Sequence, residues 1–82
     1  MNSKEIRLKI KEILSKEFDI NLNEITENSK LFSDGLLDSF NLIELVNELE
    51  EKFEIKFGTL DINFNNLDSI DNINSFIIEK LK

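Results

Sequence analysis

The sequence predicts an all-α fold, a four-helix bundle with three long helices and one short helix. Three segments, residues 3–18, 39–53 and 70–81, carry apolar residues at intervals of three and four, which is the spacing of amphipathic helices. The chain contains no proline, and its one strand-like stretch, residues 54–57, has no second strand to pair with. Because 82 residues are enough for one small domain and too few for two, we expect a single domain over residues 1–82.

The first helix is expected over residues 3–18, with Ser3 as its N-cap and Asp19 at its exit. Its apolar stripe consists of Ile6, Ile10, Ile13, Leu14 and Phe18. Residues 19–38 follow without a clean period, and since so long a loop is unusual in a small domain, we expect helical turns near residues 23–26 and 31–33. Apolar residues of this loop are expected to anchor it on the core: Ile20, Leu22, Ile25, Leu31, Phe32, Leu36 and Leu37.

The second helix, over residues 39–53, is expected to have Asp38 as its N-cap and Leu37 packed against Leu42 as a hydrophobic staple. Beyond it we expect a loop over residues 54–57, a short helix over residues 61–66, and Ser69 as the cap of the last helix. The predicted inner stripes are Leu42, Leu45, Val46, Leu49 and Phe53 in the second helix, and Ile70, Ile73, Ile77 and Leu81 in the last.

The composition excludes several classes of function. The chain has neither cysteine nor histidine, so it has no thiol nucleophile, no serine–histidine pair and no usual zinc ligand. We therefore expect a protein that is not an enzyme. No run of 18 apolar residues and no signal peptide is present, which predicts a cytoplasmic protein that does not span a membrane.

The net charge of −7 is concentrated in the middle of the chain, where residues 19–54 hold ten acidic and two basic residues. A polyanion would meet this surface unfavourably, so nucleic acid is not an expected ligand. The acidic middle predicts an interaction surface for partners with basic patches.

Two acidic groupings have simpler interpretations than catalysis or metal binding. Residues 61–69 resemble a calcium-binding loop only faintly, because its sixth and twelfth positions hold Asn66 and Asn72 instead of glycine and glutamate. We expect no metal site there. Glu48, Glu50 and Glu51 are expected on the solvated face of the second helix, where carboxylates serve neither as acid nor as base.

Ser39 is the strongest candidate site residue. The dipeptide Asp38-Ser39 alone is typical of a helix start, but here it follows the long loop and opens the most acidic helix. A helix N-terminus presents free N–H groups and partial positive charge, which favours a phosphate ester. Without histidine Ser39 has no base to activate it as a nucleophile, so we interpret it as a candidate modification site.

The stretch Leu-Phe-Ser-Asp-Gly-Leu-Leu-Asp-Ser-Phe at residues 31–40, followed by the apolar and acidic pattern of residues 42–50, resembles the acyl carrier protein family. The family pattern is Asp-Ser-Leu, with 4′-phosphopantetheine on the serine; Phe40 replaces the usual leucine here. The order Gly-Leu-Leu-Asp-Ser is more similar to D-alanyl carrier proteins and other stand-alone carriers than to fatty-acid carriers. The resemblance implies 4′-phosphopantetheine on Ser39, with Asp38 helping to orient it.

The resemblance also implies partners: a phosphopantetheinyl transferase, an acyl- or aminoacyl-loading ligase, and acyltransferases with basic docking patches, meeting a monomeric carrier. The expected docking residues on the second helix are Phe40, Ile43, Glu44, Asn47, Glu48 and Glu51. Phe40 and Ile43 lie at the border of the apolar stripe, so Phe40 either completes the core or forms an exposed contact. The alternative function is a helical adaptor with an acidic docking face and no prosthetic group.

Overall fold

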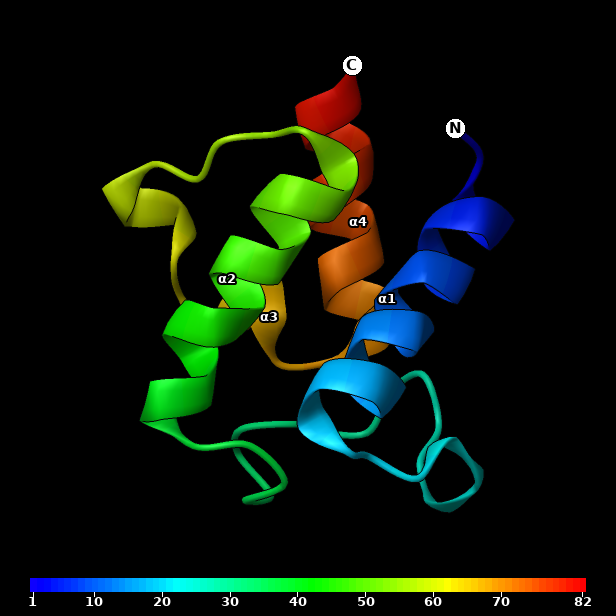
Figure 1. Cartoon of the computed structure of the whole chain (residues 1–82). Helices are drawn as coiled ribbons and strands as arrows, with labels where there is room; N and C mark the ends of the chain where they lie inside the picture. The colour runs from blue at the N-terminus through cyan, green and yellow to red at the C-terminus, as the bar shows by residue number, and fades with distance from the viewer.

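Three long helices form the bundle in the computed structural model, which describes residues 1–82: α1 (Ser3–Phe18), α2 (Ser39–Phe53) and α4 (Ile70–Leu81). The chain descends through α1 and returns through α2 and α4, and both termini lie at the end of the molecule away from the start of α2 (Figure 1). The short helix α3 (Phe64–Leu67) leads into α4, and two 3₁₀ turns, η1 (Leu22–Glu24) and η2 (Thr59–Asp61), lie in the loops. The predicted bundle of three long helices and one short helix is confirmed.

One apolar core joins these elements. Leu81 was predicted to belong to it but is 41% exposed, because it is the last residue of α4. Phe18 and Leu42 pack only at its edge. The core consists of sixteen buried residues: Ile6, Ile10, Ile13, Leu14, Leu31, Phe32, Leu37, Leu45, Val46, Leu49, Phe53, Ile55, Leu67, Ile70, Ile73 and Ile77.

The helix caps follow the sequence with one exception. Ser69 caps α4 as predicted, with its hydroxyl accepting a hydrogen bond from the Asn72 N–H at 3.1 Å. The prediction of Ser3 as the cap of α1 is wrong, since the side chain of Asn2 accepts from the Glu5 N–H at 2.9 Å and Ser3 is the first helical residue. The Ser3 hydroxyl instead contacts α4 and the Arg7 side chain.

The segment between α2 and α4 differs in detail from the sequence prediction. Residues 54–57 form a loop as expected, but the single short helix predicted over residues 61–66 is divided into η2 and α3. Asn63 separates them, because its side chain accepts from the Asn66 N–H at 3.0 Å and so begins a new helix. No helix of the chain combines the length and apolar character that crossing a bilayer requires.

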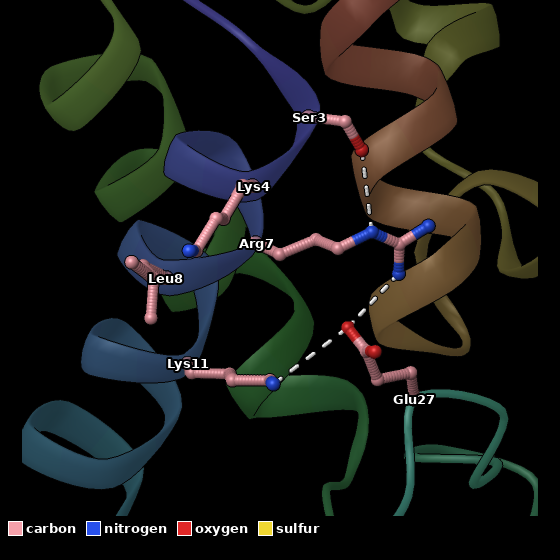
Figure 2. A pocket seen from close by; sticks show the side chains of 6 residues that line it. All are labelled: Ser3, Lys4, Arg7, Leu8, Lys11 and Glu27. Carbon is pink, nitrogen blue, oxygen red and sulfur yellow. Dashed lines mark hydrogen bonds and ion pairs between the residues drawn. The ribbon is translucent and has the colours of Figure 1, made fainter.

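Arg7 connects α1 to two distant segments. Its guanidinium pairs with Asp71 in the first turn of α4 and with Glu27 in the loop after η1, at 2.9 Å. The hydrogen bond to Asp71, and to a smaller extent the one to Glu27, raises the pKa of Arg7. Figure 2 shows Arg7 and Lys11 converging on the Glu27 carboxylate beside a concave surface. Since these two cations already have carboxylate partners, this surface is part of the tie between α1, α4 and the loop.

Candidate functional site

The first turn of α2 is held by reciprocal hydrogen bonds. The Asp38 carboxylate accepts from the N–H groups of Phe40 and Asn41, both at 3.0 Å, and the Asn41 side-chain oxygen accepts from the Asp38 N–H at 2.9 Å. This is a capping box, and it confirms the predicted N-cap. Asp38 therefore fixes the geometry of the residue that follows it.

Ser39 is that residue, the first of α2, and its side chain is exposed. Neither its hydroxyl nor its backbone N–H has a hydrogen-bond partner in the structure. The N–H groups of a first helical turn carry partial positive charge, which stabilises an adjacent phosphate oxygen. The hydroxyl is thus accessible and stands where a phosphodiester is electrostatically favoured.

A tight turn over residues 31–37 delivers the chain to this position. The Leu37 N–H donates to the Leu31 carbonyl at 2.8 Å, and both of these residues are buried in the core. Gly35 has a φ of 84°, in the left-handed region that a side chain disfavours. Leu36 was predicted to anchor this loop on the core, but it is 48% exposed because the turn projects it outward.

Exposed apolar side chains follow Ser39 on α2. Phe40 is 82% exposed and Ile43 is 55% exposed, so Phe40 does not complete the core. These two side chains are three residues apart and so lie on one face of the helix, where they form an apolar patch at the start of α2, which we call the apolar patch below. Exposed apolar side chains grouped in this way are typical of contact surfaces.

Carboxylates follow the apolar patch along α2. Glu44, Asn47 and Glu51 are exposed, and Glu48 is half-buried. Burial and the nearby carboxylates of Glu17 and Glu51 raise the pKa of Glu48. Glu44, Asn47 and Glu51 therefore lie on the outer face of the helix as predicted, whereas Glu48 lies at its half-buried border.

Glu50 does not belong to that solvated face, contrary to the sequence prediction. It is half-buried, and its carboxylate accepts from the Phe57 N–H at 2.8 Å. The contact ties the loop after α2 back to the helix, so Glu50 has a structural role. The residues of the faint calcium-binding pattern also have other partners: Asp61 accepts from the Gly58 N–H and pairs with Lys80 at 2.9 Å.

The chain is similar to known carriers along most of its length. Residues 8–74 match the family model described as "Phosphopantetheine attachment site". An acyl carrier protein of Thermotoga maritima is 32% identical over 77 residues, which cover 94% of this chain and 93% of that protein. The chain belongs to the acyl carrier protein family. An acyl carrier protein of Buchnera aphidicola is 35% identical over 72 residues, covering 85% of this carrier and 91% of that protein. One from Wolinella succinogenes is 43% identical over 47 residues, or 57% of this carrier and 62% of that protein.

The prosthetic group of this carrier is 4′-phosphopantetheine. The start of α2 fits such a group, because it combines an exposed hydroxyl, an unpaired backbone N–H and open surface around them. The chain itself supplies no thiol, since it contains no cysteine.

Sequence reasoning missed one residue that contacts the loop leading to this site. Asp68 lies between α3 and α4 and is buried, although it was not singled out from the sequence. The available signal was an acidic residue directly after the apolar Leu67 and before the cap Ser69, where burial is expected.

Proposed function

We propose that this protein carries an acyl or aminoacyl group as a thioester on 4′-phosphopantetheine attached to Ser39. The observation that carries the proposal is the exposed Ser39 hydroxyl, free of hydrogen bonds, at the first position of α2 and inside the matched residues 8–74. When attached, the group supplies the thiol that this chain lacks. The protein acts as a carrier, and partner enzymes perform the chemistry.

The chain's own residues have distinct roles in this proposal. Asp38 keeps the first turn of α2 formed by accepting from the N–H groups of Phe40 and Asn41, so that the Ser39 hydroxyl stays exposed and the Ser39 N–H remains free for a phosphate oxygen. In the attachment step the hydroxyl oxygen bonds to the pantetheine-bearing phosphorus of coenzyme A. Adenosine 3′,5′-bisphosphate leaves, and the hydroxyl proton passes to a base on the transferase.

The docking surface in this proposal consists of the apolar patch and the polar outer face of α2. Phe40 and Ile43 supply apolar contact, and the residues around them steer enzymes that carry basic patches. These enzymes are a phosphopantetheinyl transferase, a loading ligase and acyltransferases. The polar residues of the surface are Glu44, Asn47, Glu48 and Glu51.

Two classes of cargo are consistent with this role, an acyl group and an aminoacyl group. The relatives named acyl carrier protein favour an acyl group, whereas the Gly-Leu-Leu-Asp-Ser order at residues 35–39 favours an aminoacyl group such as D-alanine. We infer a single carrier domain over residues 1–82 that works as a monomer in the cytoplasm. Incubation of the phosphopantetheinylated protein with acyl- and aminoacyl-adenylating ligases, followed by intact-mass measurement, identifies the class that is loaded.

The proposal is tested by intact-mass spectrometry after incubation with coenzyme A and a broad-specificity phosphopantetheinyl transferase. We expect a gain of one phosphopantetheinyl group. A helical adaptor without a prosthetic group would keep its original mass under conditions that fully convert a control carrier.

A further inference from the structure

Asp68 makes an unusually dense set of contacts with the loop that precedes Ser39. Asp68 is 6% exposed and lies at the junction of α3 and α4. One carboxylate oxygen accepts from the Phe32 N–H at 2.7 Å and the Ser33 N–H at 3.1 Å, and the other accepts from the Ser33 hydroxyl. These contacts join parts of the chain that are 35 and 36 residues apart.

The same turn is tied to this junction in two further ways. The Asp68 backbone carbonyl accepts from the Leu31 N–H at 2.6 Å. The Phe32 ring stacks on Phe64 of α3, with 5.4 Å between the ring centroids and 13° between their planes. Residues 31–33 are therefore held by a side chain, by a backbone hydrogen bond and by a ring contact at once.

Hydrogen bonds more than offset the burial of the Asp68 carboxylate. Burial acts to raise the pKa of Asp68, but hydrogen bonds from the Ser33 hydroxyl, the Ser33 N–H and the Phe32 N–H outweigh it and lower that pKa. Asp68 is thus ionised at neutral pH and accepts charge-assisted hydrogen bonds, which are stronger than neutral ones. An apolar side chain would fill the same space without holding these three donors.

The held turn leads directly to Ser39. The Leu31 carbonyl, fixed on the Asp68 side, accepts from the Leu37 N–H at 2.8 Å, and the next residue is the cap Asp38. We propose that Asp68 is a positioning residue for attachment of the prosthetic group: it holds the turn over residues 31–37 so that Ser39 is presented to the transferase. This inference rests on the proposed function.

The experiment measures steady-state transfer of the phosphopantetheine arm from coenzyme A by a phosphopantetheinyl transferase. It compares the wild-type protein with Asp68→Ala, Asp68→Asn and Ser69→Ala. In Asp68→Ala we expect kcat to fall about tenfold, as expected for the loss of charge-assisted hydrogen bonds. KM changes little, because the docking residues of α2 are untouched. Asp68→Asn keeps a carbonyl oxygen for the two N–H groups and is expected to restore kcat to within about threefold.

Ser69→Ala is the matched control. It removes the neighbouring cap of α4 and lowers the melting temperature, but it leaves the contacts of residues 31–33 in place. We expect its kcat to stay near that of the wild type. Hydrogen exchange adds a local measurement: the N–H groups of Leu31, Phe32 and Leu37 exchange faster in Asp68→Ala and not in Ser69→Ala.

Each outcome separates the two proposals. A folded Asp68→Ala that accepts the arm at the wild-type rate, or a Ser69→Ala that loses as much kcat, overturns the positioning role and leaves the proposed function intact. A wild-type protein that is never modified overturns the proposed function and the positioning role with it. Should Asp68→Ala fail to fold, Ser33→Ala removes only the hydroxyl contact and is expected to lower kcat about threefold; an unchanged kcat contradicts the role.

Discussion

At the residue scale, Asp38 and Ser39 have different roles at the start of α2: Asp38 caps the helix, and Ser39 presents a free hydroxyl. The Asp38 carboxylate is occupied by two backbone N–H groups, whereas the adjacent Ser39 hydroxyl is free. We expect Asp38→Ala to lower the free energy of unfolding by about 1 kcal/mol, the usual value of a lost N-cap. Urea denaturation measures it, with Asp34→Ala as the control, since the Asp34 side chain is exposed and has no hydrogen-bond or ion-pair partner. Equal stability of the two variants would contradict the capping role.

Glu48 gives a second residue-scale prediction, in its pH dependence. Its pKa is raised in the folded protein by burial and by the charges of Glu17 and Glu51. As pH rises through the ordinary carboxyl value, the unfolded chain loses its proton first, so the folded state becomes relatively less stable. We expect Glu48→Gln to melt at a higher temperature than wild type at pH 7, with the difference vanishing near pH 3. A variant that is less stable at pH 7 would show that the Glu48 charge is compensated.

At the scale of the element, the outer face of α2 is expected to speed association with the transferase without stabilising the fold. Glu44→Lys combined with Glu48→Lys should not lower the melting temperature, because the Glu44 carboxylate is exposed and a lysine at position 48 relieves the repulsion from Glu17 and Glu51. The same change should slow arm transfer onto Ser39 about tenfold at low salt, since charge complementarity governs association. The defect should shrink as salt is added.

The matched control changes the net charge equally on other helices. Glu5→Lys with Glu79→Lys alters two exposed carboxylates on α1 and α4. Its transfer rate should stay near that of the wild type. A control that is as slow as the α2 variant would assign the effect to net charge alone and place the docking surface elsewhere.

Helix positions were predictable because a buried stripe repeats with every turn, as in α2 and α4, and because Asp38 and Ser69 are strong caps. Asn2 and Ser3 are equally good caps locally; Ser3 is excluded by its tertiary contacts with α4. Exposure of Leu36 depends on how the loop folds back, which has no periodic signal. The position of Asp68 between Leu67 and Ser69 indicates burial, but its hydrogen-bond partners lie about half the chain away and only the fold brings them together.

At the scale of the whole molecule, the acidic middle of the chain is largely uncompensated. Of the ten acidic residues in positions 19–54, only Glu27 forms an ion pair. Mutual repulsion of these carboxylates destabilises the folded state, and salt screens it. We expect the melting temperature to rise with added sodium chloride and with millimolar divalent cations. A flat or falling response would mean that the charges are too far apart to repel.

The central claim is that Ser39 bears the prosthetic group, and peptide mapping of the modified protein tests it most directly. The protein is treated with coenzyme A and a phosphopantetheinyl transferase, digested and fragmented by mass spectrometry. We predict one modified peptide, with the added group on Ser39, in wild type and in Ser75→Ala, an exposed serine on α4. Ser39→Ala should remain folded and gain nothing. Modification of another serine, or of Ser39→Ala itself, would contradict the account.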